Sequence, residues 1–173
     1  MRFAYADPPY PGQSAKHYRD HPDYAGEVDH AALIDHLQTF DGWVLHTSSP
    51  ALRYVLPLCP DDARVMAWTK GFAAFKKNVP VAYAWEPVIV KAIRKPVVKP
   101  GMVYRDWTTA SIALKRGLVG AKPASVCEWV FGVSGLEPDD EFFDLFPGSG
   151  AVQRAWENWK QLRWLFEVAR ADE

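Results

Sequence analysis

The sequence has little cysteine and no long hydrophobic run. Its two cysteines, Cys59 and Cys127, lie far apart and form no Cys-x-x-Cys pair, which argues against a disulfide framework or a cysteine-rich zinc site. No apolar stretch is long enough to cross a bilayer, and the start of the chain shows Arg2 without the apolar region of a signal peptide. The sequence therefore predicts a soluble, cytoplasmic protein with no membrane partner.

Net charge is also small, at −1 over 173 residues, but it conceals a strongly basic middle segment. Residues 70–122 carry 11 Lys and Arg residues and only 2 acidic ones, Glu86 and Asp106, between two acidic flanks. Aromatic residues are interleaved with the cations, a combination suited to neutralising phosphates and stacking on bases. A solvated basic face is the alternative. The candidate nucleic-acid contacts in this segment are Lys76, Lys77, Arg94, Lys95 and Arg105.

Apolar runs alternate with helical patterns along the chain. Strands are predicted at 2–6, 42–47, 63–68, 81–90, 141–146 and 163–168, and helices at 29–40, 50–58, 122–135 and 151–162. Pro87 interrupts the fourth strand, which predicts an edge position or a bulge. The alternation predicts an α/β fold with a mostly parallel sheet covered by helices on both faces, in a single domain over 1–173. Such sheets bind ligands beyond the carboxyl ends of their strands.

The first predicted strand ends in an unusual turn, Asp7-Pro8-Pro9-Tyr10. Prolines lack an N–H group and fix their φ angle, so the carbonyls around them point outward rigidly. A carboxylate beside such a carbonyl supplies two acceptors for the hydrogens of an exocyclic amine, and a neighbouring aromatic ring can stack on a heterocycle. An adenine flipped out of a nucleic acid fits such a pocket. The alternative is a proline-rich turn in which Asp7 caps local N–H groups.

A second unusual turn, Pro147-Gly148-Ser149-Gly150, stands between a predicted strand and a predicted helix. Glycines allow close approach of the backbone, and the N–H groups at a helix start attract a carboxylate or a phosphate. No Gly-Lys-Ser/Thr follows, so the turn is not a nucleotide P-loop, and Gln153 replaces the third glycine of the dinucleotide motif. An ordinary strand-to-helix turn explains the glycines as well.

Three stretches together carry a resemblance to a known family: "YADPPY", "AWEPVIV" and "GAKPASVCEWVFGVSGLEPDDEFFDLFPGSGAV". In this order they are similar to the S-adenosylmethionine-dependent amino-methyltransferases of adenine N6, in the circularly permuted, beta-class arrangement with the catalytic motif first. That family includes bacterial and phage DNA adenine methyltransferases, among them restriction–modification enzymes, and relatives of the mRNA adenosine methyltransferase. The resemblance implies a Rossmann-like methyltransferase fold in which the strand before Asp7 lies beside the strand before the glycine turn.

The resemblance also implies roles for individual residues. The catalytic set is Asp7, Pro8, Pro9 and Tyr10: Asp7 and the carbonyl of Pro8 accept hydrogen bonds from the target amine, and Tyr10 stacks on the flipped base. Lys122 contacts the carboxylate end of the cofactor, S-adenosyl-L-methionine, and Glu167 its ribose hydroxyls. The cofactor set as a whole is Ala6, Asp7, Lys122, Asp144, Phe146, Gly148, Ser149, Gly150 and Glu167.

The sequence thus predicts an enzyme that methylates N6 of adenine in DNA, by direct in-line transfer without a covalent intermediate or a metal. Aspartate at position 7 favours adenine, because serine is commoner in the cytosine-N4 branch of the family. RNA adenine and cytosine N4 are alternative targets. A non-catalytic nucleic-acid-binding subunit of a methyltransferase complex is the alternative from another class, and a homodimer or a partner subunit is compatible with either.

Overall fold

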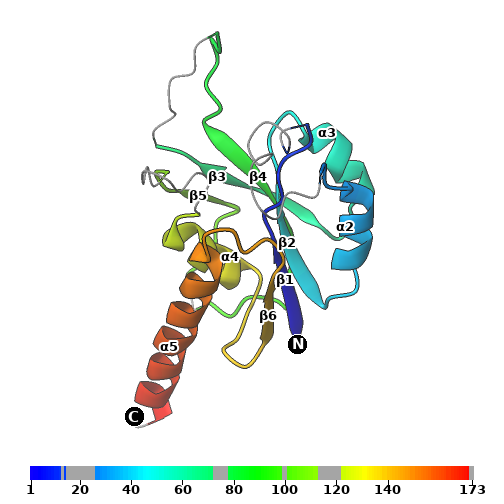
Figure 1. Cartoon of the computed structure of the whole chain (residues 1–173). Coiled ribbons are helices and arrows are strands. Elements are labelled where there is room, and N and C mark those ends of the chain that lie inside the picture. The colour runs from blue at the N-terminus through cyan, green and yellow to red at the C-terminus, as the bar shows by residue number, and fades with distance from the viewer. Residues whose placement is uncertain (13, 15–25, 72–77, 99–100, 113–121, 172–173) are drawn as a thin grey trace.

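The computed structural model describes residues 1–12, 14, 26–71, 78–98, 101–112 and 122–171 (Figure 1). Its elements are, in chain order, β1 (Arg2–Ala6), α2 (His30–Leu37), β2 (Gly42–His46), α3 (Leu52–Val55), a 3₁₀ turn (Leu56–Leu58), β3 (Arg64–Thr69), β4 (Trp85–Lys91), β5 (Trp107–Thr109), α4 (Ala124–Val133), β6 (Glu141–Asp144) and α5 (Ala151–Ala171). The strands predicted at 2–6, 42–47, 63–68 and 141–146 are confirmed with small changes at their ends.

The six strands form one sheet in the order β5-β3-β4-β2-β1-β6. β1 pairs in parallel with both β2 and β6, and β3 pairs in parallel with β5. Only β4 runs against its neighbours β2 and β3. The predicted mostly parallel sheet is therefore confirmed, and the carboxyl ends of β1, β2, β3 and β6 meet at one edge together with the beginning of β4.

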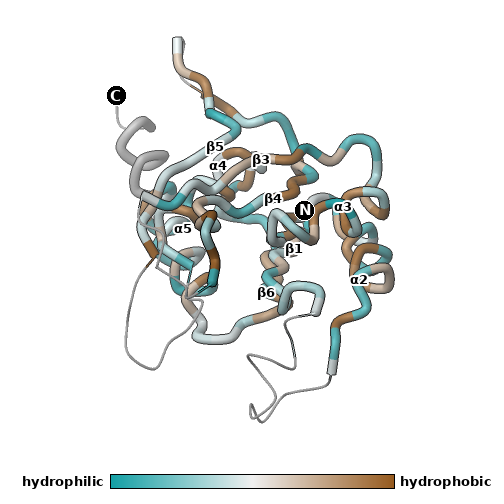
Figure 2. Tube along the Cα trace, turned by 90° about the horizontal axis from the view of Figure 1, so that it is seen from above, coloured by the Kyte–Doolittle hydropathy of each residue, from teal (hydrophilic) through white to brown (hydrophobic). Residues whose placement is uncertain are grey.

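Helices cover both faces of the sheet, as the alternating pattern predicted. α2 and α3 lie on one side of the strands, and α4 and α5 lie on the other (Figure 2). Alternate residues of β1 divide between the two sides: Phe3 and Tyr5 belong to the core under α4 and α5, whereas Ala4 and Ala6 belong to the core under α2 and α3. This period of two is what a strand buried on both faces requires.

Local sequence signals set the bounds of the helices. Asp29 caps α2 by accepting hydrogen bonds from the backbone N–H groups of Ala31 and Ala32. α4 begins directly after Pro123, and the stop predicted near Gly135 is confirmed. Gly135 has φ +71°, and a Cβ there would lie 2.4 Å from the carbonyl oxygen of Arg94, so only glycine fits at this helix end.

The position of β4 corrects one expectation. β4 pairs with strands on both sides, so the edge position predicted from Pro87 is wrong. Thr47 donates its backbone N–H to the carbonyl of Pro87 at 3.2 Å, but proline has no N–H to return. β2 ends at His46, one residue earlier. Pro87 is tolerated inside the sheet because the hydrogen-bonded pairing of β4 with β2 stops at this position. The backbone N–H that proline lacks is therefore not needed there.

The last predicted strand is also wrong, because residues 163–168 continue α5. Trp156 and Trp159 on this helix pack against Phe131 of α4, with ring centroids 5.4 and 5.8 Å from it. No proline or glycine follows Ala151 within the helix, so nothing ends it after Leu162. Over the described part of the chain, no helix combines the length and the apolar character needed to cross a membrane.

Candidate active site

The turn Asp7-Pro8-Pro9-Tyr10 leaves the carboxyl end of β1, at the edge where the other parallel strands also end. Ala6 closes the strand and is fully buried, Pro8 is buried, and Asp7, Pro9 and Tyr10 are half-buried. The Asp7 side chain is 21% exposed. Most of it is therefore shielded from water, and a small part remains open to solvent.

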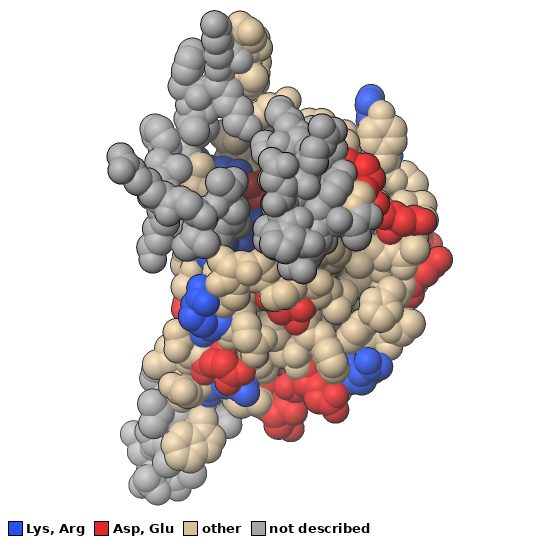
Figure 3. Space-filling view, viewed as in Figure 1, with Lys and Arg blue, Asp and Glu red and all other residues tan. Residues whose placement is uncertain are grey.

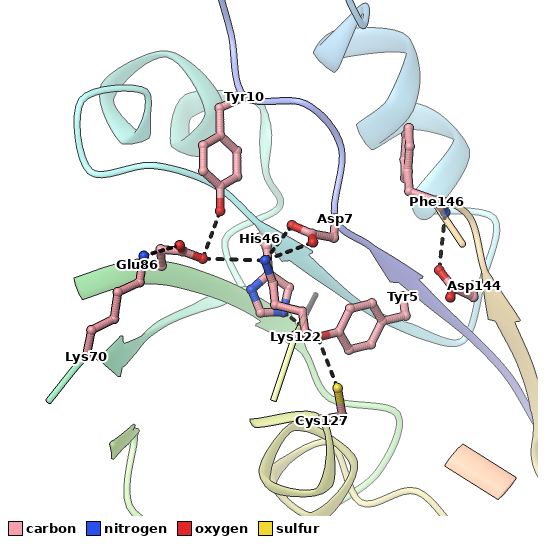
Figure 4. A network of polar contacts seen from close by, with 10 residues as sticks. All are labelled: Tyr5, Asp7, Tyr10, His46, Lys70, Glu86, Lys122, Cys127, Asp144 and Phe146. Atoms are coloured by element: carbon pink, nitrogen blue, oxygen red, sulfur yellow. Dashed lines mark hydrogen bonds and ion pairs between the residues drawn. The ribbon is translucent and has the colours of Figure 1, made fainter. Parts of the chain in front are cut away.

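Asp7 forms an ion pair with Lys122, which stands just before α4. The ammonium nitrogen of Lys122 lies 2.9 Å from Oδ1 and 2.8 Å from Oδ2 of Asp7 (Figure 4). The Lys122 side chain is only 6% exposed, so its charge is balanced by protein groups rather than by water. Lys122 also lies 3.5 Å from Oε2 of Glu86. The described contacts thus direct Lys122 toward Asp7, with Glu86 as a more distant second partner.

Glu86, the second residue of β4, joins three partners from other elements. Tyr10 donates its hydroxyl to Oε2 of Glu86 at 2.8 Å, and Lys70 pairs with Oε1 (Figure 4). Lys70 and Lys122 both lie over the ring of the buried Trp68, 5.0 and 5.4 Å from its centroid. Two carboxylates and two ammonium groups thus form one compact network of zero net charge.

Burial and these charges act against each other in the network. Burial raises the pKa of Asp7, and Lys122 only partly offsets this effect. Burial alone also raises the pKa of Glu86, but Lys122 and Lys70 outweigh it and lower that pKa to about 2. Burial lowers the pKa of Lys122, yet Asp7, Tyr10 and Glu86 more than compensate and its pKa is raised. Glu86 is therefore the carboxylate that holds its charge more strongly, and Asp7 is the one that takes up a proton more readily.

Beneath this network lies a neutral pair from β1 and β2. The Tyr5 hydroxyl and Nε2 of His46 share a hydrogen bond of 2.7 Å, and both side chains are fully buried. Burial lowers the pKa of His46 well below its usual value, and Lys122 adds to this effect. His46 is therefore a neutral core residue. Its Nδ1 and the Thr47 hydroxyl are buried without a hydrogen-bond partner among the described residues.

The glycine turn leaves β6, the strand beside β1. Tyr5 pairs with Asp144, and the N–H of Leu145 bonds to the carbonyl of Tyr5 at 2.9 Å, so the turn begins next to Asp7. The predicted adjacency of the two motif strands is therefore confirmed. Gly148 and Gly150 have φ angles of +43° and +68°, a conformation that favours glycine. Gly150 stands directly before α5 and donates its N–H to the carbonyl of Pro147.

Asp144 has an acceptor that nothing in the described chain fills. Its Oδ1 accepts the N–H of Phe146 at 3.2 Å, whereas Oδ2 is buried without a partner. Burial raises the pKa of Asp144, which is the expected result for a carboxylate with so few donors. A buried orphan acceptor is costly unless a ligand donates to it. Asp144 and the half-buried Phe146 therefore place an unfilled acceptor beside the glycine turn.

Some predicted site residues lie elsewhere. Arg94 pairs with Asp140 at the opposite edge of the sheet, and Lys95 follows it there as an exposed residue. Arg105 stands before β5, also at that edge, with its guanidinium over Trp107. Lys76 and Lys77 are outside the described residues, and Glu167 lies on α5 with its side chain outside them as well. On the face drawn in Figure 3, the described Lys and Arg side chains form no single broad patch.

Glu86 and Lys70 were not assigned to the site from the sequence, where Glu86 belonged only to a motif stretch. One signal could have drawn attention to Glu86: it is one of two acids in the basic segment, directly before the apolar run of its strand. The other acid, Asp106, forms an exposed pair with Arg64. Among the described residues, no three His, Cys, Asp or Glu side chains gather as a metal site requires.

Comparison with solved structures supports the fold. The crystal structure of the M1.HpyAVI–SAM complex matches with a TM-score of 0.61 at 18% identity, over 92% of this chain and 79% of that chain. A second structure of M1.HpyAVI matches with a TM-score of 0.59 at 16% identity, over 92% and 76% of the two chains. No protein-family model and no curated protein matches the sequence. The chain thus shares its fold with M1.HpyAVI.

Proposed function

We propose that this protein transfers a methyl group from S-adenosylmethionine to the N6 amine of adenine in DNA. The observation that carries the proposal is the meeting of two turns at adjacent strand ends. Asp7-Pro8-Pro9-Tyr10 follows β1, and Pro147–Gly150 follows β6 directly beside it. This adjacency supports the proposal because it brings a carboxylate suited to an amine and a glycine turn suited to a cofactor to the same edge of the sheet. The shared fold with a structure that contains SAM supports the choice of cofactor.

The amine side of the site rests on Asp7 and Tyr10. The partly exposed Asp7 carboxylate and the carbonyl of Pro8 accept the two amine hydrogens, which leaves the nitrogen lone pair facing the methyl donor. Tyr10 is fixed by its hydrogen bond to Glu86, so its ring offers a rigid surface on which an extruded base stacks. Rigid placement is what direct transfer needs, because no covalent bond to the protein forms.

The cofactor side rests on Asp144, Phe146 and the glycine turn. S-adenosylmethionine supplies an activated methyl group when bound. The unfilled Oδ2 of Asp144 suits a donor of this molecule, such as a hydroxyl or its ammonium group, and the glycines leave space for close approach. These residues fit the cofactor. Contact between Lys122 and the cofactor carboxylate stays a prediction, as does the role of Glu167.

Labelled methyl transfer to DNA and to RNA, followed by mass spectrometry of the nucleosides, tests the proposal. We expect N6-methyladenine in DNA. Methyladenine found only in RNA, or N4-methylcytosine, would change the assigned target, and no methylated nucleoside from any DNA would overturn the proposal. The variant Asp7→Ala should abolish transfer and still bind S-adenosylmethionine in calorimetry. A wild-type protein that binds nucleic acid but no S-adenosylmethionine would instead favour a non-catalytic subunit.

A further inference from the structure

Lys122 is shared unequally between two carboxylates. Its ammonium nitrogen lies 2.8–2.9 Å from the oxygens of Asp7 but 3.5 Å from the nearest oxygen of Glu86. The Lys122 side chain is almost fully buried, so it requires a counter-ion within the protein at every stage of a reaction. Glu86 is close enough to become the principal counter-ion after a small movement of the ammonium group.

Methyl transfer removes the charge of Asp7 if Asp7 takes the proton. The amine nitrogen forms a bond to the methyl carbon while the carbon–sulfur bond breaks, and the electron pair of that bond stays on sulfur. The nitrogen then carries a positive charge and releases one proton to the carboxylate of Asp7. A neutral Asp7 no longer balances Lys122, so a second negative group must be ready beside it.

Glu86 can serve as this second negative group because its carboxylate is both fixed in position and ionised. Lys70 occupies its Oε1 and Tyr10 donates to its Oε2, so the carboxylate is fixed in place. Burial opposes ionisation, but the two lysines lower the pKa of Glu86 to about 2, and it stays charged where Asp7 becomes protonated. Glu86 therefore keeps its charge throughout a cycle in which Asp7 gains and loses one.

We propose that Glu86 is a positioning residue that keeps Lys122 charged and in place while Asp7 accepts the proton of the substrate amine. This inference rests on the proposed methyl transfer, because it assigns the proton acceptor of that reaction. Glu86 touches neither the base nor the cofactor in this scheme. It acts through Lys122, and it also orients Tyr10 through the hydroxyl.

The charges around Glu86 fix the sign of the expected effects. Five groups face Glu86: Lys70 directly after β3, Lys122 before α4, Asp7 and Tyr10 in the turn after β1, and the neutral His46 in β2. Its negative charge raises the pKa of Asp7, and the positive charge of Lys70 lowers it. Removing Glu86 must therefore lower the pKa of Asp7, whereas removing Lys70 must raise it.

The test measures two quantities in Glu86→Gln, Lys70→Gln and the wild type. The first is the pKa of the Asp7 carboxyl group, followed by the ¹³C chemical shift of its carboxyl carbon. This signal is assigned by its loss in the variant Asp7→Asn. The second is the pH dependence of single-turnover methyl transfer with saturating S-adenosylmethionine. We expect Glu86→Gln to slow transfer about tenfold and to shift the acid limb of the profile to lower pH, because Asp7 becomes a weaker proton acceptor. Lys70→Gln should shift the limb to higher pH.

Two variants separate the contributions of charge and shape. Tyr10→Phe removes the hydrogen bond to Glu86 and should leave the acid limb in place, which distinguishes loss of Tyr10 orientation from loss of charge. Glu157→Gln removes a carboxylate from the surface of α5 and should change neither quantity.

The inference would be overturned if the pKa of Asp7 shifted in the same direction in Glu86→Gln and Lys70→Gln, or if it shifted in neither variant. The NMR titration decides this even if the wild type transfers no methyl group, a result that would overturn the proposed function instead. If Glu86→Gln does not fold, the upward shift in Lys70→Gln is still required.

Discussion

Two ion-pair networks lie at opposite ends of β1, and their buried carboxylates receive different sets of hydrogen-bond donors. At the amino end, Asp140 accepts from the α-amino group of Met1 at 3.0 Å, from both terminal nitrogens of Arg94 at 2.7 and 2.8 Å, and from the N–H of Glu137 at 2.8 Å. At the carboxyl end, both oxygens of Asp7 contact a single ammonium group among the described residues, that of Lys122, and the side chain remains partly exposed.

The difference in donors shifts the pKa values of the two carboxylates in opposite directions. Burial raises the pKa of both, but at Asp140 the hydrogen bonds from Arg94 and from the backbone reverse the effect, and its pKa is lowered. At Asp7 burial prevails and the pKa is raised. Asp140 has its acceptor sites filled, whereas Asp7 keeps capacity for a further donor. Two similar buried ion pairs thus differ in pKa because of the number of donors that each carboxylate receives.

Asp7→Asn should produce the largest effect that separates the two networks. The substitution keeps the shape of the side chain but turns one acceptor oxygen into a donor and removes the proton acceptor. We expect single-turnover methyl transfer to fall by roughly 10³-fold, within the range of lost acid–base catalysis. Binding of S-adenosylmethionine, measured by calorimetry, should change little. Transfer within tenfold of the wild type would contradict the role of Asp7.

Asp140→Ala should affect stability instead of activity. It leaves Arg94 and the α-amino group without their carboxylate, and breaking such a pair typically costs about 3 kcal/mol in the free energy of unfolding. Urea unfolding measures this loss, and methyl transfer per folded molecule should stay unchanged at a temperature where the variant is folded. Asp139→Ala, at the exposed neighbouring position, is the matched control and should change stability by about 0.5 kcal/mol or less.

The pH dependence of unfolding should sharpen the contrast further. Because the folded pKa of Asp140 is lowered, its ionised form stabilises the protein above the unfolded pKa of about 3.9, and this stabilisation is lost as pH falls through the folded value. The stability gap between the wild type and Asp140→Asn should therefore be largest near neutral pH and shrink below about pH 4. Asp7, with a raised pKa, contributes with the opposite sign. A gap that grows in acid would contradict this assignment.

The smallest effect is expected at the exposed pair Arg64–Asp106. The two side chains are 65% and 50% exposed, so water screens their 2.8 Å contact. Asp106→Asn should change the free energy of unfolding by about 0.5 kcal/mol or less, measured by the same urea titration. A loss comparable to that of Asp140→Ala would show that burial and donor number do not decide the strength of these pairs.

Much of the fold could be predicted from local pattern, but the network could not. The strand before Asp7 and the strand before the glycine turn are short apolar runs ended by prolines or glycines, and their adjacency followed from the resemblance. Glu86 and Lys122 stand 36 residues apart and meet only because β4 runs antiparallel inside the sheet. A single proline suggested an edge strand or a bulge instead, since sequence alone does not reveal where the neighbouring ladder stops.

The end of the chain shows a similar limit. Residues 163–168 are rich in apolar side chains, which suggested a buried strand, yet they extend α5. Trp164 is 59% exposed, so the apolar character of this residue did not indicate that it is buried. The assignment of Glu167 to a strand end was wrong for the same reason. The helical spacing of the apolar residues was the better predictor of structure in this segment. Trp156 and Trp159, which this spacing buries, belong to the same continuous helix.

Because β4 runs antiparallel to its neighbours, the register of the sheet determines which side chain of β4 stands beside Asp7 at the edge. Asp7 is carried to the edge by the end of a strand, but Glu86 is carried there by the beginning of one, with Val88 opposite His46 and Glu86 opposite Trp68. A slip of β4 by one residue would move Glu86 by roughly 3.4 Å and turn it to the other face. The apolar side chains that hold this register therefore also determine the distances between the two carboxylates and the lysine that they share.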